Sequence, residues 1–218
     1  MQKLVFLEIN ANCRDILDAV LRINAIEPTY EVIGYVTRDG SPARKGAEYP
    51  LLGDFSALGS LEEDVQITGF VFGPATYRNW PGFIEGLRLP KDRFATVIDP
   101  RATVAPTSIV GKGSVVLAGT TVGADVTIGD HVIVLQNVSI SHDDVIGDYT
   151  CISVGAGFSG SVHVERNCFI GANATLIRGP VGEGSMIGAG SLIRTPVPPG
   201  EVWVGNPGRK LRNLNEKH

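Results

Sequence analysis

The chain has 218 residues, of which 43% are hydrophobic and 19% are charged, with a formal net charge of −4 at pH 7. This composition supplies enough apolar material for one or two packed domains, and the negative charge argues against nucleic acid or an anionic membrane as a partner. No apolar run reaches the roughly 18 residues of a membrane-spanning helix, and the N-terminal run 4–7 is too short for a signal peptide. Three cysteines outside any metal-binding spacing favour a cytoplasmic protein with reduced thiols and no metal site.

The first part of the chain alternates between strand-like and helix-like patterns. Strands are predicted over 4–7, 30–36, 67–72 and 94–98, and helices over 14–22 and 77–87. This alternation is typical of an α/β unit with a small, parallel, Rossmann-like sheet, which we place at residues 1–95. In such sheets ligands bind beyond the carboxyl ends of the strands. The loops 8–13, 37–40 and 73–78 are therefore candidate binding loops.

From residue 98 to residue 197 the sequence repeats every six residues. Apolar residues recur at this spacing: Ile98, Val104, Val110, Val116, Val122, Ile128, Val134, Ile140, Ile146, Ile152, Phe158, Val164, Ile170 and Leu176, then, after one residue drops out, Val181, Ile187 and Ile193. A small or β-branched residue usually follows four places later. Six matches neither the helix period nor strand alternation, but it fits a coil of short strands and corners with about 18 residues per turn. The pattern predicts a parallel β-helix over residues 96–218, including a capping segment at its end.

One histidine of the coil lies beside acidic residues. His142 comes two places after the inward-pointing Ile140, so we expect it at a corner on the outer surface, next to Asp143. The hexad pattern alone favours a solvated corner histidine, and the alternative is a general base supported by the neighbouring carboxylate. His131 and His163 have no acidic successor, so we interpret both as structural.

Several segments together carry a family resemblance. They are the hexad coil, residues 141–148 (Ser-His-Asp-Asp-Val-Ile-Gly-Asp), 155–160, 169–172 (Phe-Ile-Gly-Ala) and 205–207 (Gly-Asn-Pro). With them the chain resembles the hexapeptide-repeat acyltransferases, in particular the group that includes sialic acid O-acetyltransferases and N-acetyltransferases of nucleotide-linked amino sugars. The resemblance is strong over 98–207 and weak over 1–95. It implies a left-handed β-helix, a homotrimer, and acetyl-CoA lying along the coil between subunits.

The resemblance also implies roles for individual residues. His142 would be the general base and Asp143 its supporting acid, while the backbone N–H of Gly160 would face the thioester oxygen. The reaction would be a direct attack of an amine or hydroxyl on the thioester, without an enzyme nucleophile.

The acetyl-CoA contacts implied by the resemblance are Cys151, Ala172 and Ala189. The two alanines would line the pantetheine groove, where small side chains allow close approach. Cys151 stands where the family usually has a second histidine, and it would be a filler or, less favoured, an acyl-accepting thiol. Arg209 and Lys210 would either contact the CoA phosphates or form a solvated basic tail.

The N-terminal unit departs from the family pattern. The usual glycine-rich loop after the first strand is replaced by residues 8–14, which contain no glycine. A rebuilt substrate pocket would use Asn10, Asn12 and Arg38 as polar contacts, with Gly73 matching the third loop of the family. The alternative is that the nucleotide site has been lost, and plain loop residues are the simpler interpretation at Asn10 and Gly73.

We therefore expect acetyl-CoA-dependent transfer to the amino group of a nucleotide-linked amino sugar in polysaccharide or glycan synthesis. Sugar O-acetylation requires the same base and remains an alternative. A non-catalytic trimeric β-helix is the alternative from a different class. A metalloenzyme like the γ-class carbonic anhydrases is disfavoured, because His131 and His142 are 11 residues apart rather than one 18-residue turn.

Overall fold

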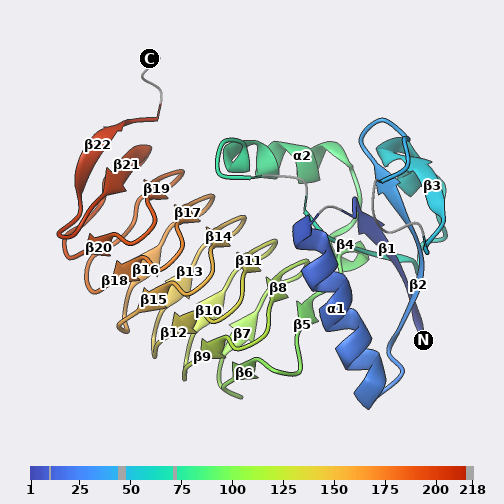
Figure 1. Ribbon diagram of the computed structural model, residues 1–218, viewed down its shortest axis with the longest axis horizontal. Helices are drawn as coiled ribbons and strands as arrows, with labels where there is room; N and C mark the ends of the chain where they lie inside the picture. The colour runs from blue at the N-terminus through green and yellow to red at the C-terminus, as the bar shows by residue number, and fades with distance from the viewer. Residues whose placement is uncertain (10, 44–47, 71–72, 215–218) are drawn as a thin grey trace.

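The structure is a computed structural model that describes residues 1–9, 11–43, 48–70 and 73–214 (Figure 1). Its N-terminal unit is a four-stranded parallel sheet with the strand order β3-β2-β1-β4. The elements of this unit are β1 (Gln2–Leu7), α1 (Ala11–Ile26), β2 (Tyr30–Thr37), β3 (Leu51–Asp54), the 3₁₀ turn η1 (Phe55–Ser60), β4 (Gln66–Thr68), η2 (Tyr77–Asn79), α2 (Trp80–Gly86) and η3 (Lys91–Arg93). The expected small parallel sheet is confirmed.

The extents of some elements in this unit differ from the expectation. Strand β4 ends at Thr68, because Gly69 follows with a φ of +110°, a conformation that favours glycine. The strand predicted over 94–98 is divided: Phe94 makes a single parallel bridge to Ile67, whereas Val97 already belongs to the coil. Strand β3 was not predicted, because its four residues include a glycine and an aspartate, both poor strand formers.

Beyond this unit the chain forms a coil of two-residue strands. They are β5 (Val97–Ile98), β6 (Thr103–Val104), β7 (Ile109–Val110), β8 (Val115–Val116), β9 (Thr121–Val122), β10 (Thr127–Ile128), β11 (Ile133–Val134), β12 (Ser139–Ile140), β13 (Val145–Ile146), β14 (Cys151–Ile152), β15 (Gly157–Phe158), β16 (His163–Val164), β17 (Phe169–Ile170), β18 (Thr175–Leu176), β19 (Met186–Ile187) and β20 (Leu192–Ile193), closed by an antiparallel pair, β21 (Glu201–Val204) and β22 (Arg209–Asn213). Successive strands turn through three flat sides, so the expected left-handed parallel β-helix is confirmed (Figure 1).

The three sides of the coil are separate sheets. Face 1 contains β5, β8, β11, β14, β17, β19, β21 and β22; face 2 contains β6, β9, β12, β15, β18 and β20; face 3 contains β7, β10, β13 and β16. Strands of one face pair in parallel 18 residues apart, as Ile133 does with Cys151. The dropped residue shortens one turn to 17, which pairs Val164 with Val181.

The period of six follows from how each side is built. The second residue of a strand, such as Ile152 or Ile170, points into the prism and is fully buried. Corner residues such as Asn137 and Asp143 have a φ near +57° to +59°, which Asn and Asp tolerate better than most residues. Each turn therefore contributes three apolar side chains to one continuous core, and the stacked turns stabilise one another.

Face 1 is the side against which the N-terminal unit packs. Its outward side chains Cys151 and Phe169 are buried in the same cluster as the N-terminal core. The hydroxyl of Tyr77 donates to the carbonyl of Gly184 at 2.8 Å, and the indole N–H of Trp80 donates to the carbonyl of His131 at 3.2 Å. The two units thus share an apolar interface, and among the described residues the coil strands that contribute to the N-terminal core cluster are those of face 1.

Within the described residues, no helix is long and apolar enough to cross a membrane.

Candidate active site

His142 lies at the corner between faces 2 and 3, where β12 ends and β13 begins. Its Nδ1 is 2.7 Å from Oδ2 of Asp143, and both side chains are more than half exposed. The pKa of His142 is raised, first by the hydrogen bond to Asp143 and then by the charge of that carboxylate. With the Nδ1 proton directed to Asp143, Nε2 carries the lone pair. This arrangement can accept a proton from a bound nucleophile.

Gly160 lies beside the His142 ring on the next coil. A Cβ atom at Gly160 would be 2.9 Å from Nε2 and 3.0 Å from Cε1 of His142, and the glycine has a φ of +95°. Any side chain here would push the imidazole from its position. The structure therefore brings together the three residues expected to catalyse the reaction, while the role of the Gly160 N–H stays a prediction.

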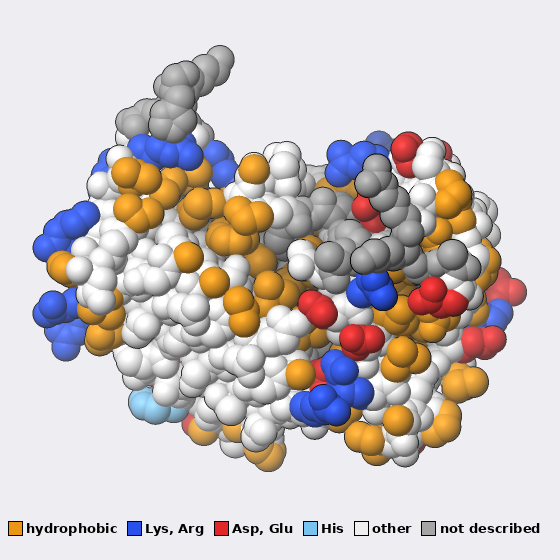
Figure 2. Space-filling view, viewed as in Figure 1, with side chains coloured by type: hydrophobic (Ala, Val, Ile, Leu, Met, Phe, Trp, Pro, Cys, Tyr) orange, Lys and Arg blue, Asp and Glu red, His pale blue; other side chains and the backbone are white. Residues whose placement is uncertain are grey.

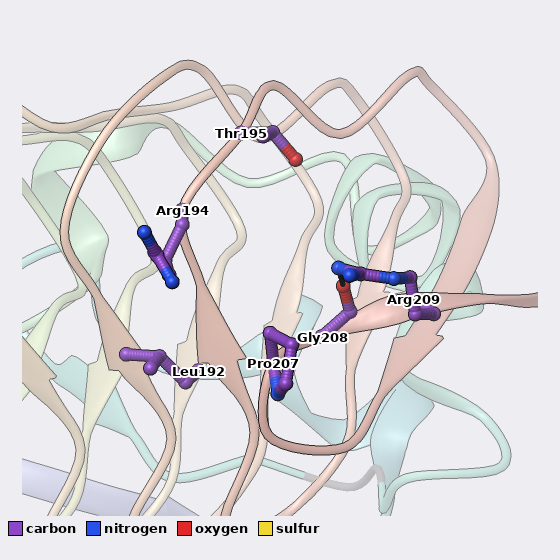
Figure 3. A pocket seen from close by; sticks show the side chains of 6 residues that line it. All are labelled: Leu192, Arg194, Thr195, Pro207, Gly208 and Arg209. Carbon is purple, nitrogen blue, oxygen red and sulfur yellow. Dashed lines mark hydrogen bonds between the residues drawn. The ribbon is translucent and has the colours of Figure 1, made fainter.

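Two arginines lie further along the same corner, toward the end of the coil. Arg178 occupies the corner after β18, and Arg194 occupies it after β20. Arg194 and Arg209 line a pocket of about 280 Å³ with Leu192, Thr195, Pro207 and Gly208 (Figure 3). Lys210 differs from its neighbour, because its Nζ pairs with Oε1 of Glu201 at 2.6 Å. Of the two basic candidates in the tail, Arg209 lines this pocket and Lys210 forms an ion pair.

A second pocket, of about 170 Å³, lies where the N-terminal unit meets face 1. Its lining residues are Asn12, Phe70, Gly73, Pro74, Leu135, Cys151, Ser153 and Phe169. The pocket unites two residues expected to contact substrate with one expected to contact acetyl-CoA. Burial raises the pKa of the Cys151 thiol to about 12, so the thiol stays protonated at neutral pH. A protonated thiol is a poor nucleophile, which argues against acyl transfer through Cys151.

The remaining described candidates, Ala172, Ala189 and Arg38, are not among the residues that line this second pocket. Ala172 and Ala189 are successive residues of the corner between faces 1 and 2, where the N–H of Gly190 donates to the carbonyl of Ala172 at 2.8 Å. Arg38 is exposed immediately after β2, at the edge of the sheet where α1 begins after β1. Asn10 lies outside the described residues.

Within one chain the candidates form two separate groups. His142, Asp143 and Gly160 lie at the corner between faces 2 and 3, whereas the other described candidates lie on face 1, at its corner with face 2, or in the N-terminal unit. The width of face 2 separates Ala172 from His142. A single chain therefore does not assemble one site from all of these residues.

The sequence did not indicate two features of the structure, namely the burial of Asp144 and the packing of His131 between aromatic rings. Asp144, next to the His142–Asp143 pair, is fully buried. It occupies one of the inward corner positions, which are otherwise small or β-branched residues. His131 stacks on Tyr149 with ring centroids 5.3 Å apart and meets Phe94 edge-on at 4.7 Å. Burial lowers the pKa of His131. Its position at the domain interface agrees with a structural role.

The described histidines of the coil do not converge within a chain. His131 is buried between aromatic rings at the corner between faces 3 and 1, and His142 is at the corner between faces 2 and 3. His163 on face 3 is 3.2 Å from Glu165. In the described part of the chain, no group of three or more His, Cys, Asp or Glu side chains is arranged to hold a metal ion.

Comparisons with known proteins place this geometry in a class. Residues 161–195 match the family model described as the hexapeptide repeat of succinyl-transferase. Gamma carbonic anhydrase 1, mitochondrial, from Arabidopsis thaliana is 37% identical over 145 residues, which are 56% of this chain and 52% of that protein. The matches to this protein and to gamma carbonic anhydrase 2, mitochondrial, of the same plant span about half the length of each.

Solved structures match over nearly the whole chain. The acetyltransferase domain of PglB from Neisseria gonorrhoeae FA1090, in complex with acetyl coenzyme A, has a TM-score of 0.82 and 28% identity, covering 96% of this chain and 99% of that domain. PerB from Caulobacter crescentus, in complex with CoA and GDP-perosamine, has a TM-score of 0.80, 21% identity and coverage of 96% and 97%. The second likeness concerns the fold alone.

These findings confirm the expected resemblance: the chain is similar to the hexapeptide-repeat acyltransferases. More particularly, its two-unit architecture is that of the PglB acetyltransferase domain. The site residues themselves stay predictions.

Proposed function

We propose that this protein transfers an acetyl group from acetyl-CoA to the amino group of a nucleotide-linked amino sugar, with His142 as the general base. The observation that carries the proposal is the His142–Asp143 pair, with the exposed His142 ring lying beside Gly160. The similarity to an acetyltransferase domain solved with acetyl coenzyme A supports the choice of donor.

The proposed mechanism needs only this corner and its ligands. The amine attacks the thioester carbonyl as its proton passes to Nε2 of His142, and Asp143 stabilises the resulting imidazolium. Negative charge develops on the carbonyl oxygen, where a backbone donor such as the Gly160 N–H would contribute a few kcal/mol. The C–S bond then breaks, and the CoA sulfur leaves with a proton returned by His142.

The pocket at the end of the coil supports a position for the CoA phosphates. Three coils separate His142 from Arg194, about 14 Å at a strand spacing of ~4.8 Å. The extended pantetheine arm of CoA spans a gap of this order between thioester and diphosphate. With the thioester beside His142, the phosphates would reach Arg194 and Arg209, whose guanidinium groups suit phosphate oxygens.

A homotrimer would reconcile the two groups of candidate residues. The corner between faces 2 and 3 of one chain would meet the corner between faces 1 and 2 of its neighbour, so that Ala172 and Ala189 of the neighbour line the acetyl-CoA groove. The second pocket, with Asn12, Gly73 and Cys151, would then open toward the His142 of another subunit. Closed cyclic symmetry of this kind lets one heterologous contact complete three identical sites.

The acceptor is the least constrained part of the proposal. Asn12 and Gly73 line the second pocket, and Arg38 follows a strand of the same parallel sheet, where nucleotides bind in α/β units. A sugar hydroxyl would use the same base, so O-acetylation is the second candidate reaction. The sequence match to gamma carbonic anhydrase 1 does not change this preference, because it covers 52% of that protein, whereas the similarity to the PglB acetyltransferase domain covers 99% of that domain.

The test is release of free CoA thiol from acetyl-CoA with a panel of UDP-, dTDP- and GDP-linked 3-amino and 4-amino sugars and their hydroxyl analogues. Turnover with an amino sugar, absent with its hydroxyl analogue, supports N-acetylation, and the reverse supports O-acetylation. Acetyl-CoA binding without turnover on any acceptor would favour a non-catalytic trimeric module and contradict the proposal.

A further inference from the structure

The interior of the coil contains one residue that departs from its repeat. Each corner of the coil places one small side chain inward. We call these inward corner residues, taken in chain order, the column: Ser108, Ser114, Thr120, Val126, Val132, Val138, Asp144, Thr150, Ala156, Val162, Cys168, Ala174, Ser185 and Ser191. Only Asp144 in this column bears an ionisable carboxyl group, and its side chain has no exposed surface. A buried carboxylate costs free energy unless it is well hydrogen-bonded. Its location, two residues after His142, therefore calls for a physical reason.

Asp144 makes one hydrogen bond that a serine in this column also makes. At the same corner two coils earlier, Ser108 accepts the N–H of Val126 through Oγ at 2.9 Å. Oδ1 of Asp144 accepts the N–H of Val162 in the equivalent way, at 2.8 Å. A serine would satisfy this part of the coil equally well.

The second hydrogen bond of Asp144 has no counterpart at Ser108. Oδ2 of Asp144 accepts the N–H of Ser141 at 2.8 Å, within the corner that carries His142. At this corner on neighbouring coils, the equivalent N–H groups join the strand ladder: Gly123 donates to Ile140 at 2.9 Å, and Ser159 donates to Leu176 at 3.0 Å. The N–H of Ser141 is thus directed to a side chain rather than to the next coil.

The strand pairing records the same change. β12 pairs with β9 through both of its residues, but it pairs with β15 through Ser139 alone. The backbone N–H that is missing from the ladder belongs to Ser141, one residue before His142. It is missing on the side of β12 that faces the coil of Gly160. The corner that carries His142, the candidate base, is therefore also the corner where the carboxylate of Asp144 accepts hydrogen bonds inside the coil.

We propose that Asp144 is a positioning residue for the base: its buried carboxylate holds the N–H of Ser141 out of the ladder and so sets the corner that presents the His142 ring beside Gly160. This inference rests on the proposed role of His142. Asp144 also acts through its charge, since it raises the pKa of His142 in addition to the larger effect of Asp143. Burial in turn raises the pKa of Asp144 itself, opposed by its two backbone hydrogen bonds.

The experiment replaces Asp144 with serine, the residue that the coil already uses at Ser108. The variant should fold and bind acetyl-CoA as the wild type does, because the bond to the Val162 N–H can be kept. Its kcat should fall by roughly 10-fold to 100-fold, the cost of a displaced catalytic group, with KM for acetyl-CoA unchanged. Ser108→Ala is the matched control: it removes a cap of the same kind at the same corner and should leave kcat unchanged.

A readout independent of turnover completes the test. The imidazole of His142, followed by NMR in protein with ¹³C-labelled histidine and assigned with His142→Ala, should titrate at lower pH in Asp144→Ser than in the wild type. A wild-type kcat together with a wild-type titration would overturn the proposal. If the wild type itself shows no turnover, the proposed function fails, and the titration alone decides the role of Asp144.

A second variant covers a failure to fold. Asp144→Cys uses the residue found in the same column at Cys168, and it should show the same loss of kcat and the same shift of the His142 titration. If neither variant folds, Asp144 is required for the coil rather than for the position of His142, which would also overturn the proposal.

Discussion

At the scale of single residues, the chemistry depends on which nitrogen of His142 carries a proton. Asp143 lies 2.7 Å from Nδ1 and so favours the tautomer with its lone pair on Nε2. The phase of the hexads was sufficient to place His142 at an exposed corner. The contact between its ring and Gly160 could not be derived from the period, because it depends on the left-handed corner conformation of the next coil.

Replacing Asp143 with asparagine tests this coupling. Asp143 raises the pKa of His142, and the neutral imidazole is the active base, so kcat/KM should increase with pH through that pKa. Without the carboxylate the pKa of His142 falls, and this acid limb should move to lower pH while kcat drops by about 10-fold to 100-fold. Glu165→Gln, which alters the acid beside His163, should change neither the position of the acid limb nor kcat. An unchanged acid limb in Asp143→Asn would show that Asp143 does not support the base.

At the scale of elements, the corners of the coil determine where a ligand can approach the backbone. Ala118, Ala172 and Ala189 belong to the corner column between faces 1 and 2, where the carbonyl of Ala118 accepts the N–H of Asn137 at 3.0 Å. A small side chain at this corner would leave room for the pantetheine arm of CoA to lie against the backbone. The period of six predicted these corners, since three short strands per 18 residues leave only corners between them.

Ala172→Leu should weaken acetyl-CoA binding by about 10-fold or more, because a branched side chain would fill the proposed groove. Binding can be measured by calorimetry, with thermal unfolding as a check that the coil is intact. Ala118→Leu places the same side chain at the same corner three coils earlier and should bind acetyl-CoA normally. Normal affinity in Ala172→Leu would contradict the groove assignment.

The elements of the N-terminal unit were harder to predict than the coil. β1, β2 and α1 have strong apolar patterns, whereas β3 has four residues and depends on its pairing with β2. The pocket that joins Asn12 to Cys151 arises from packing between two units, and no local pattern encodes that contact.

At the scale of the whole molecule, the proposal requires more than one chain. Figure 2 shows a broad, largely uncharged surface along the coil, with Lys and Arg side chains at the end away from the N-terminal unit. The second pocket lies on face 1 and His142 lies at the opposite corner. A chain of 23.2 kDa should therefore behave as a particle of about 70 kDa in solution, as a closed trimer requires.

Mixed trimers test whether neighbouring chains complete each site. Co-expression of His142→Ala with Ala172→Leu, each tagged differently, yields trimers in which some interfaces combine an intact His142 with an intact Ala172. Purified mixed trimers should recover about a third of the wild-type activity, because one of their three sites combines an intact His142 with an intact Ala172. Each variant alone should be far less active at an acetyl-CoA concentration near the wild-type KM. If each site lay within one chain, mixing would restore nothing.

The most direct test of the central claim compares the wild type with His142→Ala on the acceptor that gives the fastest release of CoA. We predict that kcat falls by at least about two orders of magnitude, with acetyl-CoA affinity and oligomeric state unchanged, while His163→Ala retains full activity. A His142→Ala variant that keeps most of its turnover would remove His142 from the mechanism and contradict the account.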